Sequence, residues 1–171
     1  LFTITERSPA LVDADRCTVY LFDSSRQELM TLQGAVEVRV PIDKGLVGAA
    51  ATGGTIINIK DAWGDARFNK DFDRSSGYRT RSVLVMPIRD TPADAAEKPT
   101  LVGVLQLINK KSAPMFTEQD IQLLQSFVDI VGNVLAASQL FQATVNKKTA
   151  QLGEASLKDL RSGGGTEEAK A

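Results

Sequence analysis

The spacing of the apolar residues changes after residue 110, and this change constrains the fold more than any other feature of the chain. Before it, short apolar stretches alternate with charged residues, as in Val36-Glu37-Val38-Arg39-Val40, which places the valines on one face of a half-buried strand. From Phe116 onward the apolar residues recur every three or four positions, as they do in an amphipathic helix. The chain therefore predicts a sheet followed by a long helix.

The same patterns predict where the individual elements lie. We expect strands at residues 17–22, 28–33, 36–41, 55–59, 82–88 and 101–108. We also expect a turn at Gly45 followed by a short Ala-rich helix that stops at Gly53 or Gly54, and a long helix from Thr117 to at least Val145. The polar stretch 60–80 shows no alternation and is typical of short helices and loops. The predicted fold is α+β, with about six antiparallel strands in one sheet, helices on both faces and a long C-terminal connecting helix. We expect a globular domain at 1–145 and a helix end with a Gly-rich tail at 146–171.

Composition excludes most catalytic chemistry and several kinds of partner. The chain has no histidine and a single cysteine, Cys17, so His-containing metal sites, Ser-His-Asp triads and intrachain disulfides are excluded. The net charge is −1, which disfavours nucleic acid as a partner. No apolar run approaches the roughly 18 residues of a membrane span, so we expect no membrane span in this chain. We expect a cytoplasmic protein without a metal, and the start at Leu1 suggests a piece of a longer chain.

Five short stretches occur in an order that is typical of one family. They are 15–21 (Asp-Arg-Cys-Thr-Val-Tyr-Leu), 45–48 (Gly-Leu-Val-Gly), 55–59, 77–82 and 103–110. Together they resemble a GAF domain, and more narrowly the tandem GAF modules that bind cyclic nucleotides in phosphodiesterases and cyanobacterial adenylyl cyclases. The resemblance covers about residues 10–145. It implies a regulatory domain that senses a ligand.

A signature of that subclass is present with one departure. It reads Asn109-Lys110, then Phe116, then Asp120, with Ile121 where the family has Glu. The resemblance implies that this motif braces the fold, through a Lys110–Asp120 salt bridge, more than it contacts ligand.

The stretch Gly45-Leu46-Val47-Gly48 stands at the start of the predicted short helix. Free backbone amides at a helix N-terminus can hold a phosphate without a buried cation. The resemblance implies that the amides of Leu46 and Val47 lie near the phosphate. Alternatively, the two glycines simply permit a tight turn from strand to helix.

Arg16, Thr18 and Tyr20 share one face of the first strand. The resemblance implies that Arg16 and Thr18 contact the base, with Arg at the first position associated with adenine. Alternatively, Arg16 pairs at the strand end with Asp13 or Asp15.

The remaining candidate ligand residues lie in the polar stretch and on the last strand. The resemblance places Asn69 on the phosphate side and Asp73, Ser76 and Thr80 beside the base and ribose. Helix capping explains Asn, Asp and Ser equally well. Gln106 points away from Leu105 and Leu107, toward a ligand, a water or a neighbouring group.

These residues lead to one principal expectation and one alternative. The principal one is a sensor of a cyclic purine nucleotide, cAMP favoured over cGMP, that signals through its terminal helices to the catalytic domain of a phosphodiesterase or adenylyl cyclase. The alternative is a GAF module that has lost its ligand and acts in dimerisation. We expect no catalytic residue and no cofactor beyond the bound nucleotide, and a homodimer formed by the terminal helices.

Overall fold

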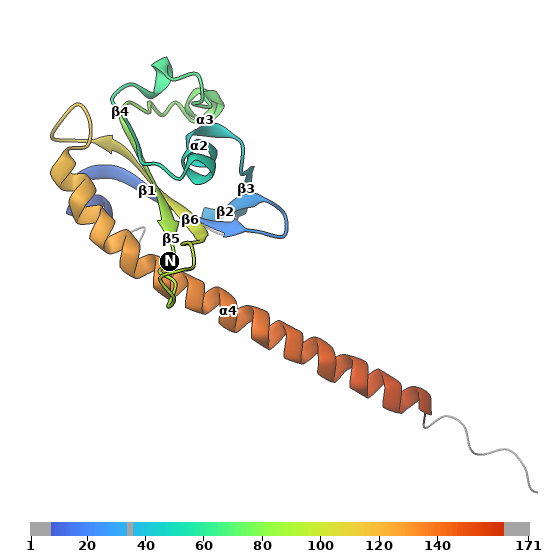
Figure 1. Cartoon of the computed structure of the whole chain (residues 1–171). Coiled ribbons are helices and arrows are strands. Elements are labelled where there is room, and N and C mark those ends of the chain that lie inside the picture. The colour runs from blue at the N-terminus through green and yellow to red at the C-terminus, as the bar shows by residue number, and fades with distance from the viewer. Residues whose placement is uncertain (1–7, 34–35, 163–171) are drawn as a thin grey trace, which may run out of the picture. The chain divides into compact units, whose positions relative to one another are not determined.

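The computed structural model describes residues 8–33 and 36–162, and within these the side chains of 8–31, 37–140 and 143. Its centre is a six-stranded sheet (Figure 1) with strand order β3-β2-β1-β6-β5-β4, in which every neighbouring pair is antiparallel. The strands are β1 (Ala14–Asp23), β2 (Glu28–Gln33), β3 (Val36–Pro41), β4 (Ile57–Ile59), β5 (Val83–Arg89) and β6 (Leu101–Lys110).

Residues 8–11 are helical and precede the strands. The helical elements that follow along the chain are α2 (Gly45–Gly53), the 3₁₀ turn η1 (Ala62–Gly64), α3 (Asp71–Ser76) and α4 (Glu118–Ser162). The predicted fold class is therefore confirmed, with changes at the element ends. Strand β1 begins three residues earlier than expected, because it continues its pairing with β6 as far as Ala14 and Lys110.

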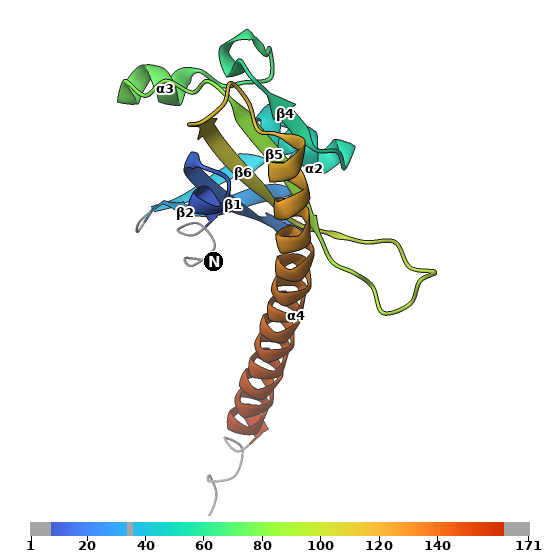
Figure 2. The same ribbon diagram turned by 90° about the vertical axis from the view of Figure 1, so that its left-hand side faces the viewer.

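The two faces of the sheet carry different apolar layers. Val83 and Val85 of β5 and Val104 of β6 pack with Leu46 and Ala50 of α2. The alternate residues of β5 and β6 point to the other face, where they are buried beside the first half of α4: Leu84, Met86, Ile88, Leu105 and Leu107. Figure 2 shows α2 and the start of α4 on opposite sides of the sheet. The predicted arrangement of helices on both faces is thus confirmed.

The first half of α4 lies very close to the end of β5. A Cβ atom built on Gly132 would lie 1.9 Å from the carbonyl oxygen of Arg89, so this position cannot hold a larger residue without a shift. Asn133 Oδ1 accepts a hydrogen bond from the Thr91 amide at 2.8 Å. On the other side of the strand, the Arg89 guanidinium packs against Gly54, which ends α2 with φ 63°.

The stretch Glu118–Leu140 of α4 is long and apolar enough to cross a membrane by length and composition alone, with a mean hydropathy of 1.3. The sequence pattern predicted no apolar run of this length, and that prediction missed this stretch because charged residues such as Asp120 and Asp129 interrupt it. A helix in the core of a soluble protein passes the same test. Leu124, Val128 and Val131 are buried in this domain, whereas only 28% of the apolar window is buried overall.

Candidate functional site

The α2 face of the sheet brings three predicted ligand residues to one place. Thr18 of β1 pairs with Gln106 of β6, and Arg16 pairs with Ile108 two positions along. Residues that pair across neighbouring strands point to the same face. We call the group Arg16, Thr18, Tyr20 and Gln106 the sheet floor.

The sheet floor keeps part of its hydrogen-bonding capacity unused. The Tyr20 hydroxyl donates to Gln106 Oε1 at 3.3 Å, so a neighbouring side chain partners one end of the amide. Among the described residues, neither Gln106 Nε2 nor the Thr18 hydroxyl makes a hydrogen bond. These two groups remain able to bind a ligand.

The N-terminus of α2 also has backbone amides without hydrogen-bond partners among the described residues. Lys44 precedes the helix in an extended conformation and makes no side-chain cap, and the first turn holds no acidic residue. The first intrahelical bond runs from the Gly48 amide to the Lys44 carbonyl at 3.0 Å, and no described residue accepts from the amides of Leu46 or Val47. The side chains of Leu46 and Val47 are buried in the core, so only their backbones can face a ligand.

Both glycines of this turn also have a structural reason. Gly45 adopts φ 69°, in the left-handed region that favours glycine. A Cβ on Gly48 would lie 2.5 Å from the Ile42 carbonyl oxygen. The tight turn therefore explains the glycines, and the unpartnered amides are what remain for a phosphate.

Asp73 is the centre of the segment 61–80, which we call the cover segment. Its side chain is 3% exposed and accepts bonds from Trp63 Nε1 at 2.8 Å, the Thr80 amide at 2.7 Å and the Thr80 hydroxyl at 2.8 Å. Burial alone would raise the pKa of Asp73, but these bonds and the positive charge of Arg79 outweigh it and lower the pKa. The carboxylate joins η1, α3 and the chain after α3.

The other predicted residues of the cover segment bond to nearby backbone. Asn69 Oδ1 accepts from the Asp71 amide at 2.9 Å and so supports the start of α3. The Ser76 hydroxyl donates to the Phe72 carbonyl at 2.7 Å and accepts from the Tyr78 amide at 3.3 Å. These are the capping bonds that the sequence allowed as the alternative to ligand contact.

Arg16 has partners within the protein. Its guanidinium lies over the ring of Tyr78, 3.9 Å from the centroid, and its Nε is 3.9 Å from Asp15 Oδ2. Asp15 also accepts a hydrogen bond from the Tyr78 hydroxyl. The pairing with Asp15 is the alternative that the sequence left open, and the contact with Tyr78 was not expected.

The signature residues sit at the end of β6 and the start of α4. Lys110 Nζ donates to the Val12 carbonyl at 2.8 Å and to Asp120 Oδ1 at 3.0 Å, and both side chains of this ion pair are largely buried. Asp120 Oδ2 accepts from the Thr117 amide at 2.7 Å, a bond across the first turn of α4. Burial would raise the pKa of Asp120, and the bonds from Thr117 and Lys110 lower it overall.

Asn109 and Phe116 complete this bracing. Asn109 has φ 58°, and its side chain accepts from the Arg81 amide at 2.7 Å and donates to the Arg79 carbonyl at 2.9 Å. Phe116 is 1% exposed, and its carbonyl accepts from Asn58 Nδ2 at 2.8 Å. All four signature residues therefore make contacts within the fold.

Two aromatic residues have larger roles than the sequence suggested. Trp63 Nε1 donates to Asp73, and the guanidinium of Arg79 lies 4.0 Å from the Trp63 ring centroid. Tyr78 links Arg16 to Asn109, which donates to its hydroxyl at 3.0 Å. The only signal in the sequence was an aromatic residue in an otherwise polar stretch, which does not identify its partner.

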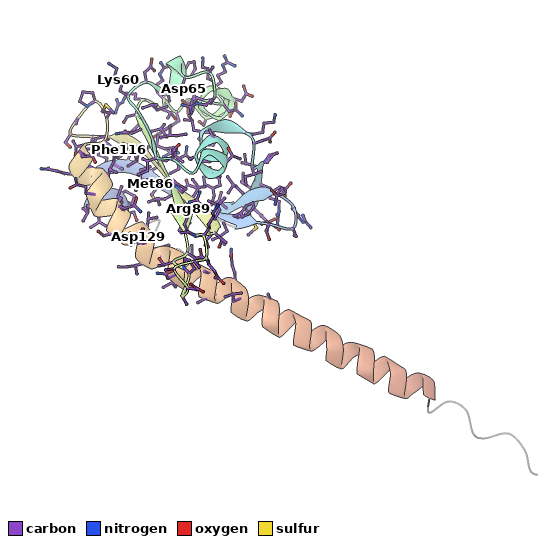
Figure 3. All side chains as sticks on the ribbon, viewed as in Figure 1. Lys60, Asp65, Met86, Arg89, Phe116 and Asp129 are labelled. Atoms are coloured by element: carbon purple, nitrogen blue, oxygen red, sulfur yellow. The ribbon has the colours of Figure 1, made fainter. Side chains whose placement is uncertain are left out.

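A separate hollow of about 510 Å³ lies at the end of β4, lined by Asn58, Ile59, Lys60, Asp61, Gly64, Asp65 and Met115. Figure 3 shows Lys60 and Asp65 at this end of the domain, away from Arg89. None of the predicted ligand residues lines it. Within the described part of the chain, no group of three or more acidic or cysteine side chains is placed to hold a metal ion.

Burial raises the pKa of Cys17 to about 12. The thiol therefore stays protonated near neutral pH, as expected of an inert core cysteine.

Comparisons with known proteins agree with this architecture. The model of the GAF domain family matches residues 1–135. The dual 3′,5′-cyclic-AMP and -GMP phosphodiesterase 11A of Takifugu rubripes is 33% identical over 150 residues, which cover 78% of this chain and 16% of that protein. The chain thus matches a small part of its relative.

Solved structures show the same fold at lower identity. The GAF domain of a phosphoenolpyruvate-protein phosphotransferase from Coxiella burnetii aligns with a TM-score of 0.68 at 20% identity, covering 82% of each chain. The corresponding domain from Acinetobacter aligns with a TM-score of 0.64 at 21% identity, again over 82% of each chain. With a family model matched over most of its length and a six-stranded sheet flanked by helices, this chain belongs to the GAF domain family.

Proposed function

We propose that this GAF domain is a regulatory module that binds a cyclic purine nucleotide, with cAMP favoured over cGMP. The observation that carries the proposal is the uncapped N-terminus of α2, whose Leu46 and Val47 amides lack acceptors within the described residues. A helix N-terminus with free amides favours a singly charged phosphodiester. The relative from Takifugu rubripes, named for both cyclic nucleotides, supports this ligand class.

Each part of the ligand has a counterpart in the domain. The cyclic phosphate would bind the amides of Leu46 and Val47. The base would bind the sheet floor, where the Thr18 hydroxyl and Gln106 Nε2 are unused and Arg16 offers a planar cation.

We assign the cover segment to holding the site closed. Asp73 and Thr80 bond each other, and Asn69 and Ser76 bond nearby backbone. To contact ligand, these side chains would have to exchange bonds they already make, and such an exchange yields little net free energy.

The domain would regulate an attached catalytic domain, of a phosphodiesterase or an adenylyl cyclase, in a cytoplasmic protein. Binding would shift the population of two conformations of α4, and the catalytic domain would respond to that shift. No residue of this chain is assigned a catalytic role, and no cofactor besides the nucleotide is proposed.

The test is isothermal titration of the nucleotide-stripped protein with cAMP and then with cGMP. Tight binding of cAMP and weaker binding of cGMP is the expected result. A folded sample that gives no heat with either nucleotide would refute the proposal.

A dimerisation module is the second candidate, and one observation favours it. Leu123, Ile130 and Val134 form an exposed apolar row on α4 with spacings of seven and four residues, as at a coiled-coil seam. Ile130 is 67% exposed, which is unusual for an isoleucine on a helix without a partner. Sedimentation equilibrium of the protein and of an Ile130→Lys variant tests this, since the variant should weaken a homodimer formed along this row.

A further inference from the structure

We propose that Tyr78 is the positioning residue that holds Arg16 flat against the ligand site, so that the free face of the Arg16 guanidinium stacks on a purine base. The inference rests on the proposed function and deepens it. It assigns a role in base selectivity to a residue outside the family's signature and outside the predicted ligand set.

The contact between the two side chains is close, with the guanidinium over the ring. The guanidinium carbon of Arg16 lies 3.9 Å from the centroid of the Tyr78 ring. A guanidinium stacks on an aromatic ring at this distance through cation–π attraction and dispersion. Arg16 comes from β1 and Tyr78 from the chain after α3, so the contact joins the sheet floor to the cover segment.

Tyr78 is itself fixed from two sides. Its hydroxyl donates to Asp15 and accepts from Asn109 Nδ2 at 3.0 Å. Asn109 in turn bonds the backbone of Arg79 and Arg81. The ring is therefore attached to the end of β6 by a residue that also braces the fold, and it offers Arg16 a rigid surface.

Arg16 still has a face available for a ligand. A planar guanidinium has two faces, and Tyr78 covers one of them. The Arg16 side chain is 52% exposed, which leaves its other face accessible. Arg16 shares a sheet face with Thr18 and Gln106, whose unused polar groups can bond the edge of the same base.

The part of a ligand that can stack on the Arg16 guanidinium is a flat, electron-rich heterocycle. Stacking strength increases with the area of the ring system, so a purine gains more than a pyrimidine. Without Tyr78, Arg16 would sample many rotamers and would pay that conformational entropy on binding.

The chain contains a matched control for this arrangement. Arg79 stacks on Trp63 at 4.0 Å, with the same chemistry and almost the same distance. Both members of that pair belong to the cover segment, and neither is part of the sheet floor. Losing the Arg79 stack should leave the base selectivity unchanged.

The experiment measures the affinities of cAMP, the pyrimidine analogue cCMP and free adenosine by calorimetry or NMR titration. Tyr78→Leu removes the ring, Tyr78→Phe keeps the ring without its hydroxyl, and Arg16→Lys keeps the charge without the planar face. We expect Tyr78→Leu and Arg16→Lys to weaken cAMP and adenosine about 10-fold, and cCMP by clearly less. Tyr78→Phe keeps the ring but loses the two hydroxyl bonds that fix it, so its effect should fall between those of the original chain and Tyr78→Leu. The control Arg79→Ala should stay within about 3-fold of the original chain.

An NMR signal reports the stack without any ligand. The Hε proton of Arg16 should show an upfield ring-current shift in the original chain and in Tyr78→Phe, and should lose it in Tyr78→Leu. Equal losses of cAMP and cCMP affinity, an equal effect of Arg79→Ala, or an unshifted Hε would each overturn the inference.

Adenosine separates this inference from the proposed function. If the original chain binds adenosine in a manner that depends on Tyr78 but binds neither cyclic nucleotide any tighter, the stacking inference stands and the cyclic-nucleotide proposal fails. If cAMP binds tightly and Tyr78→Leu leaves the ratio of the cAMP and cCMP affinities unchanged, the cyclic-nucleotide proposal stands and the stacking inference fails. If neither adenosine nor a cyclic nucleotide binds, both are wrong.

Discussion

The cover segment and the sheet floor differ in how much of their polar capacity the protein already uses. In the cover segment Asp73 accepts three hydrogen bonds, and Asn69 and Ser76 each bond a nearby backbone group. On the sheet floor the Thr18 hydroxyl and Gln106 Nε2 make no bond to a described residue. The difference indicates that the cover segment maintains its own shape while the floor, with the start of α2, is prepared for a ligand.

The largest effect, on the free energy of unfolding, is expected from removing the buried carboxylate of Asp73 in the cover segment. Asp73→Ala leaves Trp63 Nε1 and the Thr80 amide without acceptors in a buried place, which should lower the free energy of unfolding by about 3 kcal/mol. Urea unfolding followed by circular dichroism measures it.

Asp71→Ala is the control on the same helix, because the Asp71 side chain is 79% exposed and pairs only with Arg74. Its effect should stay within about 0.5 kcal/mol. Equal effects of the two variants would show that the cover segment does not depend on Asp73.

Acid should weaken the cover segment in a smaller and graded way. The pKa of Asp73 and that of Asp120 are lowered in the folded state, so both carboxylates stabilise the fold above the pKa of about 3.9 that an unfolded Asp has. This stability should be lost as the pH falls from about 4 through the lowered folded values. Urea unfolding at a series of pH values tests it.

Asp73→Asn and Asp120→Asn separate the two contributions, since each should flatten the acid limb of that stability profile. A profile below pH 4 that both variants leave unchanged would contradict the assignment of this limb to Asp73 and Asp120.

A side chain that caps the N-terminus of α2 should raise the stability of the protein and lower its affinity for cAMP. In Lys44→Asp the new carboxylate can cap the amides of Leu46 or Val47, which should stabilise the protein by about 1 kcal/mol. The same carboxylate would occupy and repel the phosphate, so cAMP affinity should fall by about 10-fold or more. Thermal unfolding and calorimetric titration give the two numbers.

Lys44→Ala is the control, because it removes the lysine charge without supplying a cap. It should leave cAMP affinity within about 3-fold, since an exposed charge near a ligand contributes little. If Lys44→Asp stabilises the fold and cAMP binds as before, the α2 N-terminus is not the phosphate site.

The smallest effect is expected from a single group of the sheet floor. Thr18→Ala removes one unused hydroxyl, so the stability should change by less than about 0.5 kcal/mol. The affinity for cAMP should fall about 5-fold, the value of one hydrogen bond, and the preference for cAMP over cGMP should change with it. Unchanged affinity and unchanged preference would remove Thr18 from the site.

The sequence predicted the parts of this structure that depend on local pattern. Alternating valines marked β3, and the three-to-four spacing after Phe116 marked α4. The alternation in β1 also predicted that Arg16, Thr18 and Tyr20 share one face, and the pairing of buried Val19 with buried Leu105 on the other face agrees with it. A period of two or of 3.6 is a property of neighbouring residues and can be read without a fold.

The bonds that distinguish the cover segment could not be predicted in this way. Asp73 bonds Trp63, ten residues earlier, across an irregular stretch with no period. Tyr78 meets Arg16 only because β1 lies beside β6 in the sheet, a contact between residues far apart in the chain. The end of α4 was predicted only as a lower bound at Val145, and the helix continues through Gly153 to Ser162. One internal glycine costs a helix only about 1 kcal/mol.

The position of Arg89 has a mechanical consequence. Its side chain packs against Gly54 at the end of α2, and its carbonyl packs against Gly132 in α4, so one residue of a central strand touches helices on both faces of the sheet. The two contacts differ in stiffness, because Gly132 lies against the Arg89 backbone, whereas Gly54 lies against the end of the flexible Arg89 side chain. A small displacement of α2 is therefore met first by the side chain of Arg89, whose backbone lies against α4. A single arginine, Arg89, thus connects the helix on one face of the sheet with the helix on the other.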